Sequence, residues 1–229
     1  MKLEDFSQGA NTRPPNRLGQ RYDHQHFLPD PGNTVVCHLD LDTAGGAAVL
    51  RARRRMQALP EAERLLFTPE DSLHMTVFEG VLDARRTADA WPADIARDAE
   101  VAEVTAAMCQ RLAAFDAPAS FAVSVDTVRL GGLELRGATP ADETALLEWR
   151  EALSRAFGYR QAAHDTYQHH MTFAYMLDWL PDSVLADWKQ GLADIQAELQ
   201  AAAPVLPLRA PAFCTFNDMT WFEELLPLA

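Results

Sequence analysis

Two stretches of the chain decide its fold: Leu73-His74-Met75-Thr76-Val77-Phe78 and His169-His170-Met171-Thr172-Phe173-Ala174. Each contains a His, an apolar residue, a Thr and a second apolar residue, and each alternates in the manner of a β-strand. Side chains of a strand point to opposite faces in turn, so the His and the Thr of each motif share a face. Two such strands facing one groove would supply two imidazoles for proton transfer and two hydroxyls for holding an anion.

The sequence around the motifs is also duplicated. A strand and a helix precede each motif, and a helix and a strand follow it. In the first half these elements are expected at residues 33–41, 44–59, 93–114 and 120–128. In the second half the strand at 132–136 leads into a helix with Thr139 as its N-cap, Pro140 at its first position and Gly158 as its stop. A helix at 182–201 and strand-like stretches at 205–222 follow the second motif.

The domain organisation follows from this duplication. We predict one domain, residues 31–229, built from two similar halves at residues 33–128 and 132–222. Residues 1–30 are polar and rich in Pro, Asn, Gln and Arg, which predicts an extended or partly ordered arm. This arm lacks the apolar core of a signal peptide.

The motifs resemble those of a known family. His74-Met75-Thr76-Val77 and His170-Met171-Thr172-Phe173 are similar to the two signature motifs of the 2H phosphoesterase superfamily, which includes 2′,3′-cyclic nucleotide phosphodiesterases and bacterial 2′-5′ RNA ligase-like proteins. The lead-in at residues 68–74 is similar too, and Pro31-Gly32-Asn33-Thr34-Val35-Val36-Cys37-His38-Leu39 resembles a bacterial branch known as DUF1868. The element order is similar over residues 31–224, whereas individual residues match only at the motifs and their flanks.

This resemblance implies an α+β fold with two lobes, in which two antiparallel sheets form a V-shaped groove and helices cover the outer faces. It implies that His74 and His170 are the catalytic acid–base pair and that Thr76 and Thr172 bind the phosphate. It also implies that no metal and no organic cofactor take part. Which His is the acid, and whether the site hydrolyses or ligates, are left open.

The residue types suit the cleavage of a cyclic phosphodiester. Attack by water needs a base to take the water proton and an acid to protonate the departing ribose oxygen. Histidine titrates near neutral pH, so one imidazole can start neutral and the other protonated. The expected substrate is a 2′,3′-cyclic nucleotide or a similar small cyclic phosphate.

Strand parity indicates which further residues reach the groove. Phe78 has the parity of His74 and is a candidate substrate-binding residue that either stacks on a base or packs the floor of the sheet. By the same parity Glu79 faces away from the groove. His38 is a second candidate substrate-binding residue, the alternative being a solvated strand edge. His169 points opposite to His170 and is expected to be structural.

The composition restricts the partners. With 20 Lys and Arg against 33 Asp and Glu, the net charge is −13, which disfavours long nucleic acid because its binding depends on many basic contacts to phosphates. No apolar run approaches the ~20 residues of a membrane span. Three widely spaced cysteines, Cys37, Cys109 and Cys214, are expected to be buried reduced thiols, and we expect a cytoplasmic protein.

Two other functions stay open. A metal-dependent hydrolase is an alternative because His164, Asp165 and His169-His170 cluster, although no His-Glu-x-x-His or Cys-x-x-Cys pattern is present and adjacent strand residues point to opposite faces. A nucleotide- or RNA-end-binding module would keep the groove without turnover. The presence of both His and both Thr residues argues against that second alternative.

Overall fold

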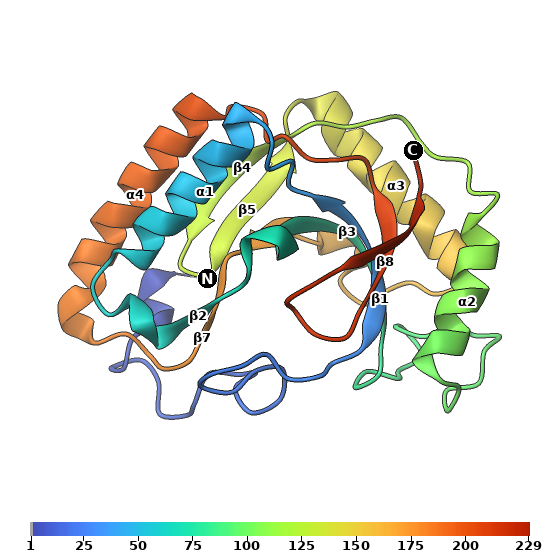
Figure 1. Ribbon diagram of the computed structural model, residues 1–229, viewed down its shortest axis with the longest axis horizontal. Helices are drawn as coiled ribbons and strands as arrows, with labels where there is room; N and C mark the ends of the chain where they lie inside the picture. The colour runs from blue at the N-terminus through green and yellow to red at the C-terminus, as the bar shows by residue number, and fades with distance from the viewer. Residues whose placement is uncertain (1) are drawn as a thin grey trace.

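The alternating stretches form antiparallel strands at the centre of the molecule (Figure 1). A computed structural model describes residues 2–229. Its strands are β1 (Gly32–His38), β2 (Leu65–Phe67), β3 (His74–Leu82), β4 (Val123–Arg129), β5 (Gly132–Gly137), β6 (His170–Thr172), β7 (Ala174–Met176), β8 (Ala212–Phe216) and β9 (Glu223–Pro227). Seven of them form one sheet in the order β4-β5-β6-β3-β1-β8-β9, and β2 pairs with β7 in a small second sheet.

The two motif strands, β3 and β6, are neighbours at the middle of the large sheet. Among the described residues they pair at one position, Met75 with Met171, and both side chains are fully buried. The halves therefore join in one sheet, where two separate sheets were expected. On either side of this junction the order is β6-β5-β4 and β3-β1-β8, which agrees with two related halves. The duplication and the V-shaped groove stay predictions.

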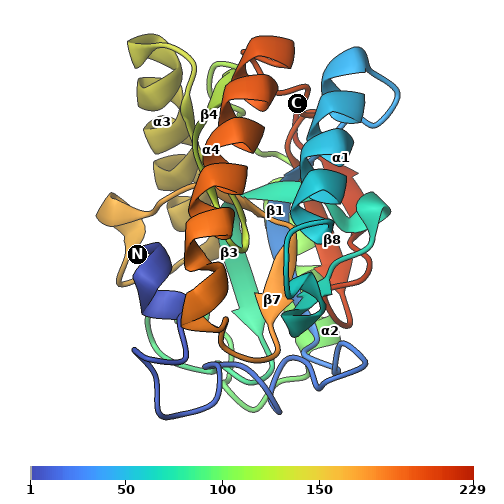
Figure 2. The same cartoon turned by 90° about the vertical axis from the view of Figure 1, so that its left-hand side faces the viewer.

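Helices cover the sheet on both sides. They are α1 (Ala44–Gln57), α2 (Val101–Leu112), α3 (Pro140–Phe157) and α4 (Leu185–Ala202). Helix α1 packs against α4 on one side (Figures 1 and 2), and α2 packs against α3 on the other (Figure 1). Each helix turns one apolar stripe toward the core, as Val104, Met108 and Leu112 of α2 do at a spacing of four residues.

Helix α3 begins and ends where the sequence predicts. The Thr139 hydroxyl accepts a hydrogen bond from the Asp142 amide, and the Asp142 carboxylate accepts one from the Thr139 amide, which completes a capping box. Gly158 ends the helix in the left-handed region, with φ of 76°.

Helix α2 is shorter than expected, since it begins at Val101 and not near residue 93. The preceding carbonyls are used elsewhere: the Arg86 guanidinium donates to the carbonyls of Arg97 at 2.6 Å and Ala99 at 2.7 Å. Arg86 also lies over the ring of the buried Trp91. These contacts hold residues 91–100 in an irregular segment.

The N-terminal arm is packed onto the domain. Tyr22 is buried, and its hydroxyl donates to the Met176 carbonyl at 2.7 Å. The rings of Tyr22 and Phe27 lie 5.1 and 5.7 Å from the ring of Tyr175. The arm therefore runs along the lower edge of the molecule in Figure 1, in contact with β7.

The character of the helices and the state of the cysteines complete the description of the fold. None of the described helices combines the length and apolar character that a membrane span requires. Cys37, Cys109 and Cys214 are free thiols, of which Cys37 and Cys214 are buried.

Candidate active site

The two motifs line one cavity of about 280 Å³. His74 and Thr76 enter it from β3, and His170 and Thr172 enter it from β6. Continuing the antiparallel register from Met75 and Met171 sets His74 across from Thr172, and Thr76 across from His170. Each imidazole thus lies next to the hydroxyl of the other motif.

The two imidazoles are oriented by equivalent hydrogen bonds. Nδ1 of His74 lies 2.7 Å from the Ser72 carbonyl, and Nδ1 of His170 lies 3.0 Å from the Gln168 carbonyl. Because a carbonyl only accepts, Nδ1 carries the proton in both rings. This leaves Nε2 of each neutral ring as the nitrogen that can accept a proton.

The surroundings of the two rings differ. The ring of His74 packs 4.1 Å from the ring of Phe222, whereas His170 is exposed. Burial lowers the pKa of His74 to about 4, and the neighbouring His38 and His170 act in the same direction. His74 is therefore neutral at neutral pH.

His169 connects the two motifs. It is buried on the opposite side of the strand from His170, and its Nδ1 lies 3.1 Å from the Thr76 carbonyl. Burial lowers the pKa of His169 to about 4, so its ring is a neutral donor. Through this contact, a residue beside the second motif holds the backbone of the first motif in place. This is the structural role expected for His169.

Tyr167 is a cavity residue whose role the sequence did not assign. Its ring lies 4.0 Å from the guanidinium of Arg150, which is buried and donates to the Val77 carbonyl at 2.7 Å. Burial raises the pKa of Tyr167, and its buried hydroxyl has no hydrogen-bond partner among the described residues. A protonated phenol thus lines the cavity with an unused hydrogen-bond donor.

A β-bulge at Val77 reverses the faces expected for Phe78 and Glu79 of β3, and a second register shift lies between Glu79 and Leu82. Thr76 pairs with Val36 and Phe78 pairs with Val35, so Val77 is the extra residue. Val77 and Phe78 are both fully buried.

The bulge corrects two predictions made from strand parity. Phe78 does not line the cavity but packs in the core against the rings of Phe157 and Tyr159, at 5.2 and 5.7 Å. Glu79, which was expected to face away, lines the cavity. Sequence parity failed here because one inserted residue exchanges the two faces of a strand.

His38 is not brought into the motif cavity. It pairs across the sheet with His74, and the two rings lie 6.3 Å apart. It lines a neighbouring cavity together with Arg209 and Trp221, and Phe222 borders both cavities.

Several other residues of the motif cavity carry no sequence signal. They come from the N-terminal arm, the end of β3, β7 and the β8–β9 connection, and include Arg17, Arg21, Arg85, Tyr175, Phe216, Met219 and Phe222. Only the folded chain brings these segments together, so no local pattern could identify them.

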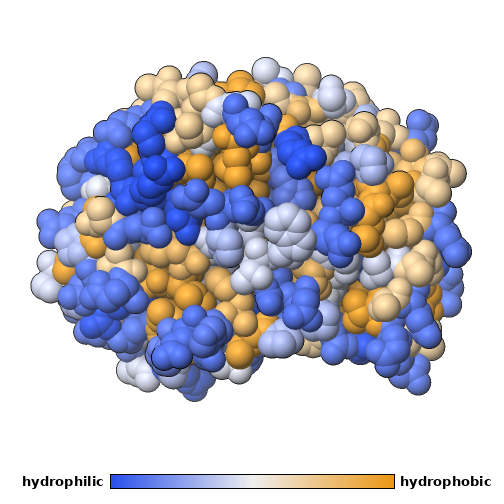
Figure 3. Space-filling model, viewed as in Figure 1, coloured by the Kyte–Doolittle hydropathy of each residue, from blue (hydrophilic) through white to orange (hydrophobic). Residues whose placement is uncertain are grey.

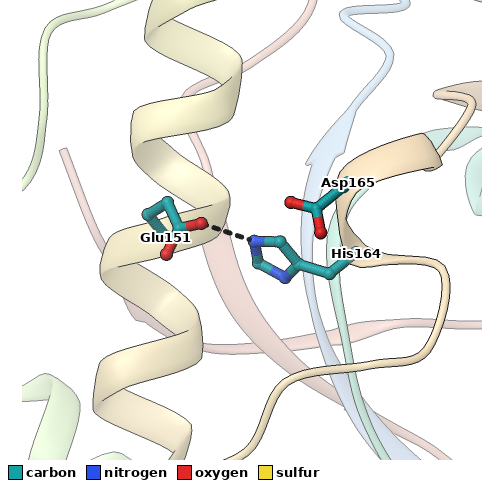
Figure 4. Close-up of side chains that lie close together, drawn as sticks. All are labelled: Glu151, His164 and Asp165. Atoms are coloured by element: carbon teal, nitrogen blue, oxygen red, sulfur yellow. Dashed lines mark ion pairs between the residues drawn. The ribbon is translucent and has the colours of Figure 1, made fainter.

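One cluster outside this cavity has metal-ligand residue types. Glu151 of α3 lies beside His164 and Asp165 of the turn before the second motif, with 3.3 Å between Nε2 of His164 and Oε1 of Glu151 (Figure 4). The Arg160 guanidinium contacts the carboxylates of Glu151 at 2.6 Å and Asp165 at 2.5 Å. A guanidinium thus already supplies the positive charge that a cation would bring, and the cluster does not fit a metal site.

Comparisons with known proteins agree with this geometry. A family model described as "2H-phosphodiest: Domain of unknown function (DUF1868)" matches residues 21–134. A solved structure of a conserved protein of unknown function from Agrobacterium tumefaciens is 39% identical, covers 99% of this chain and 98% of its own, and superposes with a TM-score of 0.97. No curated protein matches the chain. From its two motifs, its fold and the family model, the chain belongs to the DUF1868 branch of the 2H phosphoesterase family.

Proposed function

We propose that this protein is a metal-independent phosphoesterase that opens a small cyclic phosphodiester, such as a 2′,3′-cyclic nucleotide, by paired-histidine catalysis. The observation that carries the proposal is the convergence of both His and both Thr residues on one cavity. Its volume of about 280 Å³ is close to the lower end of ligand pockets, about 300–1,000 Å³. A compact substrate suits this volume.

The environments of the two rings indicate their roles. His74 is neutral because it is buried, so its Nε2 takes the proton from the attacking water. The water oxygen bonds to phosphorus as the bond to one ribose oxygen breaks. His170, exposed at the cavity, donates a proton to that ribose oxygen, and the product is a phosphomonoester.

Hydroxyl donors stabilise the charge on the phosphate. Thr76 and Thr172 each donate to a non-bridging oxygen, where negative charge increases in the transition state. Tyr167 also lines the cavity, and its protonated hydroxyl has no hydrogen-bond partner among the described residues.

The test is turnover of a panel of 2′,3′-cyclic mononucleotides in EDTA by the wild type, His74→Ala and His170→Ala. His26→Ala, at an exposed residue of the arm that does not line the cavity, is the control. We expect metal-free hydrolysis that falls at least a hundredfold in both motif variants and is unchanged in the control.

Three results would contradict the proposal. Activity that survives both motif substitutions overturns the paired-histidine mechanism. Activity that EDTA abolishes favours a metal-dependent hydrolase. Tight binding of a cyclic nucleotide with no product over hours identifies a binding module without turnover.

A further inference from the structure

The motif cavity is more cationic than the proposed reaction requires. A cyclic phosphodiester carries one negative charge, and the proposed reaction already assigns two hydroxyls and two imidazoles to it. The cavity wall adds three arginines, Arg17, Arg21 and Arg85, against one carboxylate, Glu79. This excess stands out in a chain whose net charge is −13.

Two of these arginines lie on one turn of the N-terminal arm. The amide of Arg21 donates to the carbonyl of Arg17 at 3.0 Å, closing a tight turn in which Gly19 has a φ of 79°. Both Arg17 and Arg21 line the cavity. The next residue, Tyr22, anchors the turn through its buried ring and its bond to Met176.

The three guanidiniums differ in how far they are already satisfied. Arg21 pairs with Asp30 at 2.6 Å, and Arg85 donates to Glu79 at 3.1 Å. Nε and Nη2 of Arg85 are buried without a hydrogen-bond acceptor in the described chain. The side chain of Arg17 is exposed and forms no ion pair with residues 2–229. Some guanidinium N–H groups are therefore free to bind a further anion, and Arg17 has the most of them.

We propose that Arg17, Arg21 and Arg85 form a second anion subsite beside the His–Thr pairs, and that the substrate carries a further phosphoryl group in addition to its cyclic phosphodiester. This proposal depends on the proposed function in one respect, namely that the His–Thr pairs bind the reacting cyclic phosphodiester. Guanidiniums from two separate segments can contact several oxygens of a tetrahedral phosphoryl group, whereas a carboxylate is filled by one bidentate fork. The arm thereby selects the substrate class.

The test compares the binding of adenosine 2′,3′-cyclic phosphate with that of the same nucleotide carrying a 5′-phosphate. Calorimetry on the His170→Ala protein measures binding without turnover, and wild-type turnover of both nucleotides is measured in parallel. We expect the 5′-phosphate to lower Kd at least tenfold. Arg17→Gln should reduce this gain to less than threefold, and Arg17→Lys should keep part of it. Arg13→Gln, an equal charge change in the arm outside this cavity, should keep all of it.

The outcomes separate the two proposals. A gain below threefold in the parent protein, or undetectable binding of either nucleotide, overturns the second subsite. So does a gain that Arg17→Gln leaves intact or that Arg13→Gln removes equally. A tenfold gain that depends on Arg17, without turnover of either nucleotide, keeps the subsite and overturns the proposed function. Turnover of the nucleotides without a gain in affinity from the 5′-phosphate supports the proposed function and overturns the second subsite.

Discussion

His74 and His170 occupy equivalent positions in the two motifs and share the same Nδ1 hydrogen bond, yet they are not chemically equivalent. Phe222 packs against the His74 ring, whereas His170 is exposed. A two-step proton transfer needs this difference, because a base must begin unprotonated and an acid must begin protonated. The asymmetry comes from residues outside the motifs, which is why the motif sequence left the roles open.

Removing one threonine hydroxyl should slow the proposed reaction without unfolding the protein. A hydrogen bond to a charged group is worth about 1.5–3 kcal/mol, so Thr76→Ala and Thr172→Ala should each lower kcat/KM about ten- to a hundredfold. Steady-state kinetics on the most active cyclic nucleotide check this. Thr144→Ala, at an exposed threonine of α3, is the matched control. Unchanged kinetics in both motif variants would show that the hydroxyls do not contact the phosphate.

The buried His169 should make the protein less stable in acid. Its pKa is about 4 in the folded chain, below the value of about 6.5 of an unfolded one. The unfolded chain therefore takes up the proton first, and stability is lost as the pH falls from about 6.5 to about 4. Each pKa unit corresponds to about 1.4 kcal/mol, which gives a loss of roughly 3 kcal/mol.

His169→Asn tests this loss, since its amide can still donate to the Thr76 carbonyl. Urea unfolding at several pH values should show a shallower decline for His169→Asn than for the wild type. His26→Asn, at an exposed histidine, should follow the wild type. An identical decline in all three proteins would mean that His169 does not titrate in this range.

At the scale of elements, the bulge in β3 determines which side chains line the cavity. It falls at the last residue of the first motif, so the residues directly after it obey the opposite parity. Gly80 then allows the strand to pass close to Asn33 of β1: a Cβ at Gly80 would lie 2.0 Å from Oδ1 of Asn33. Asn33 cannot easily move, because it is buried and bonded to the Val81 amide and the Thr105 hydroxyl.

Gly80→Ala should therefore destabilise the protein. Overpacking of this kind costs about 1–3 kcal/mol, and a domain of this size loses about 2–4 °C in Tm for each kcal/mol. Gly131→Ala is the control, because the nearest contact of its Cβ would be the Ala174 carbonyl at 3.3 Å. Thermal unfolding of the two variants should show the larger drop for Gly80→Ala. Equal drops would show that β1 and β3 can separate to admit the methyl group.

The elements that sequence reasoning located were those with local signals. Helix α3 was placed to the residue because its cap, its proline and its terminal glycine are adjacent to it in the chain. The start of α2 was wrong because Arg86, a distant residue, takes the carbonyls that would begin it. Strand β9 was missed, since it begins after the stretch expected to end at residue 222 and its exposed residues do not alternate. The bulge was missed because a single extra residue leaves the apolar pattern intact.

At the scale of the whole molecule, charge and shape both favour a small ligand. Hydrophilic side chains cover much of the face seen in Figure 3, with apolar patches between them. Acidic residues outnumber basic ones across the chain, while three arginines and one carboxylate line the motif cavity of about 280 Å³. The four motif residues could be predicted from the sequence, whereas the arginines could not, because the arm reaches the cavity only after folding.

A polynucleotide should compete poorly for this site. The net charge of −13 repels a long polyanion, and a cavity of about 280 Å³ suits a compact ligand. In a competition assay at low ionic strength, a 20-nucleotide RNA without a cyclic end should inhibit at least a hundredfold more weakly, per mole, than a cyclic mononucleotide. Comparable inhibition by the RNA would instead point to an RNA-binding surface.

The junction of the two motif strands has a consequence for experiment. Met75 and Met171 form the pair at which β3 meets β6, so the separation of the two imidazoles depends on one rung of the sheet. Both residues lie in the core, remote from water. Deuterium uptake by the amides around this pair therefore records how often the two strands part in the resting protein.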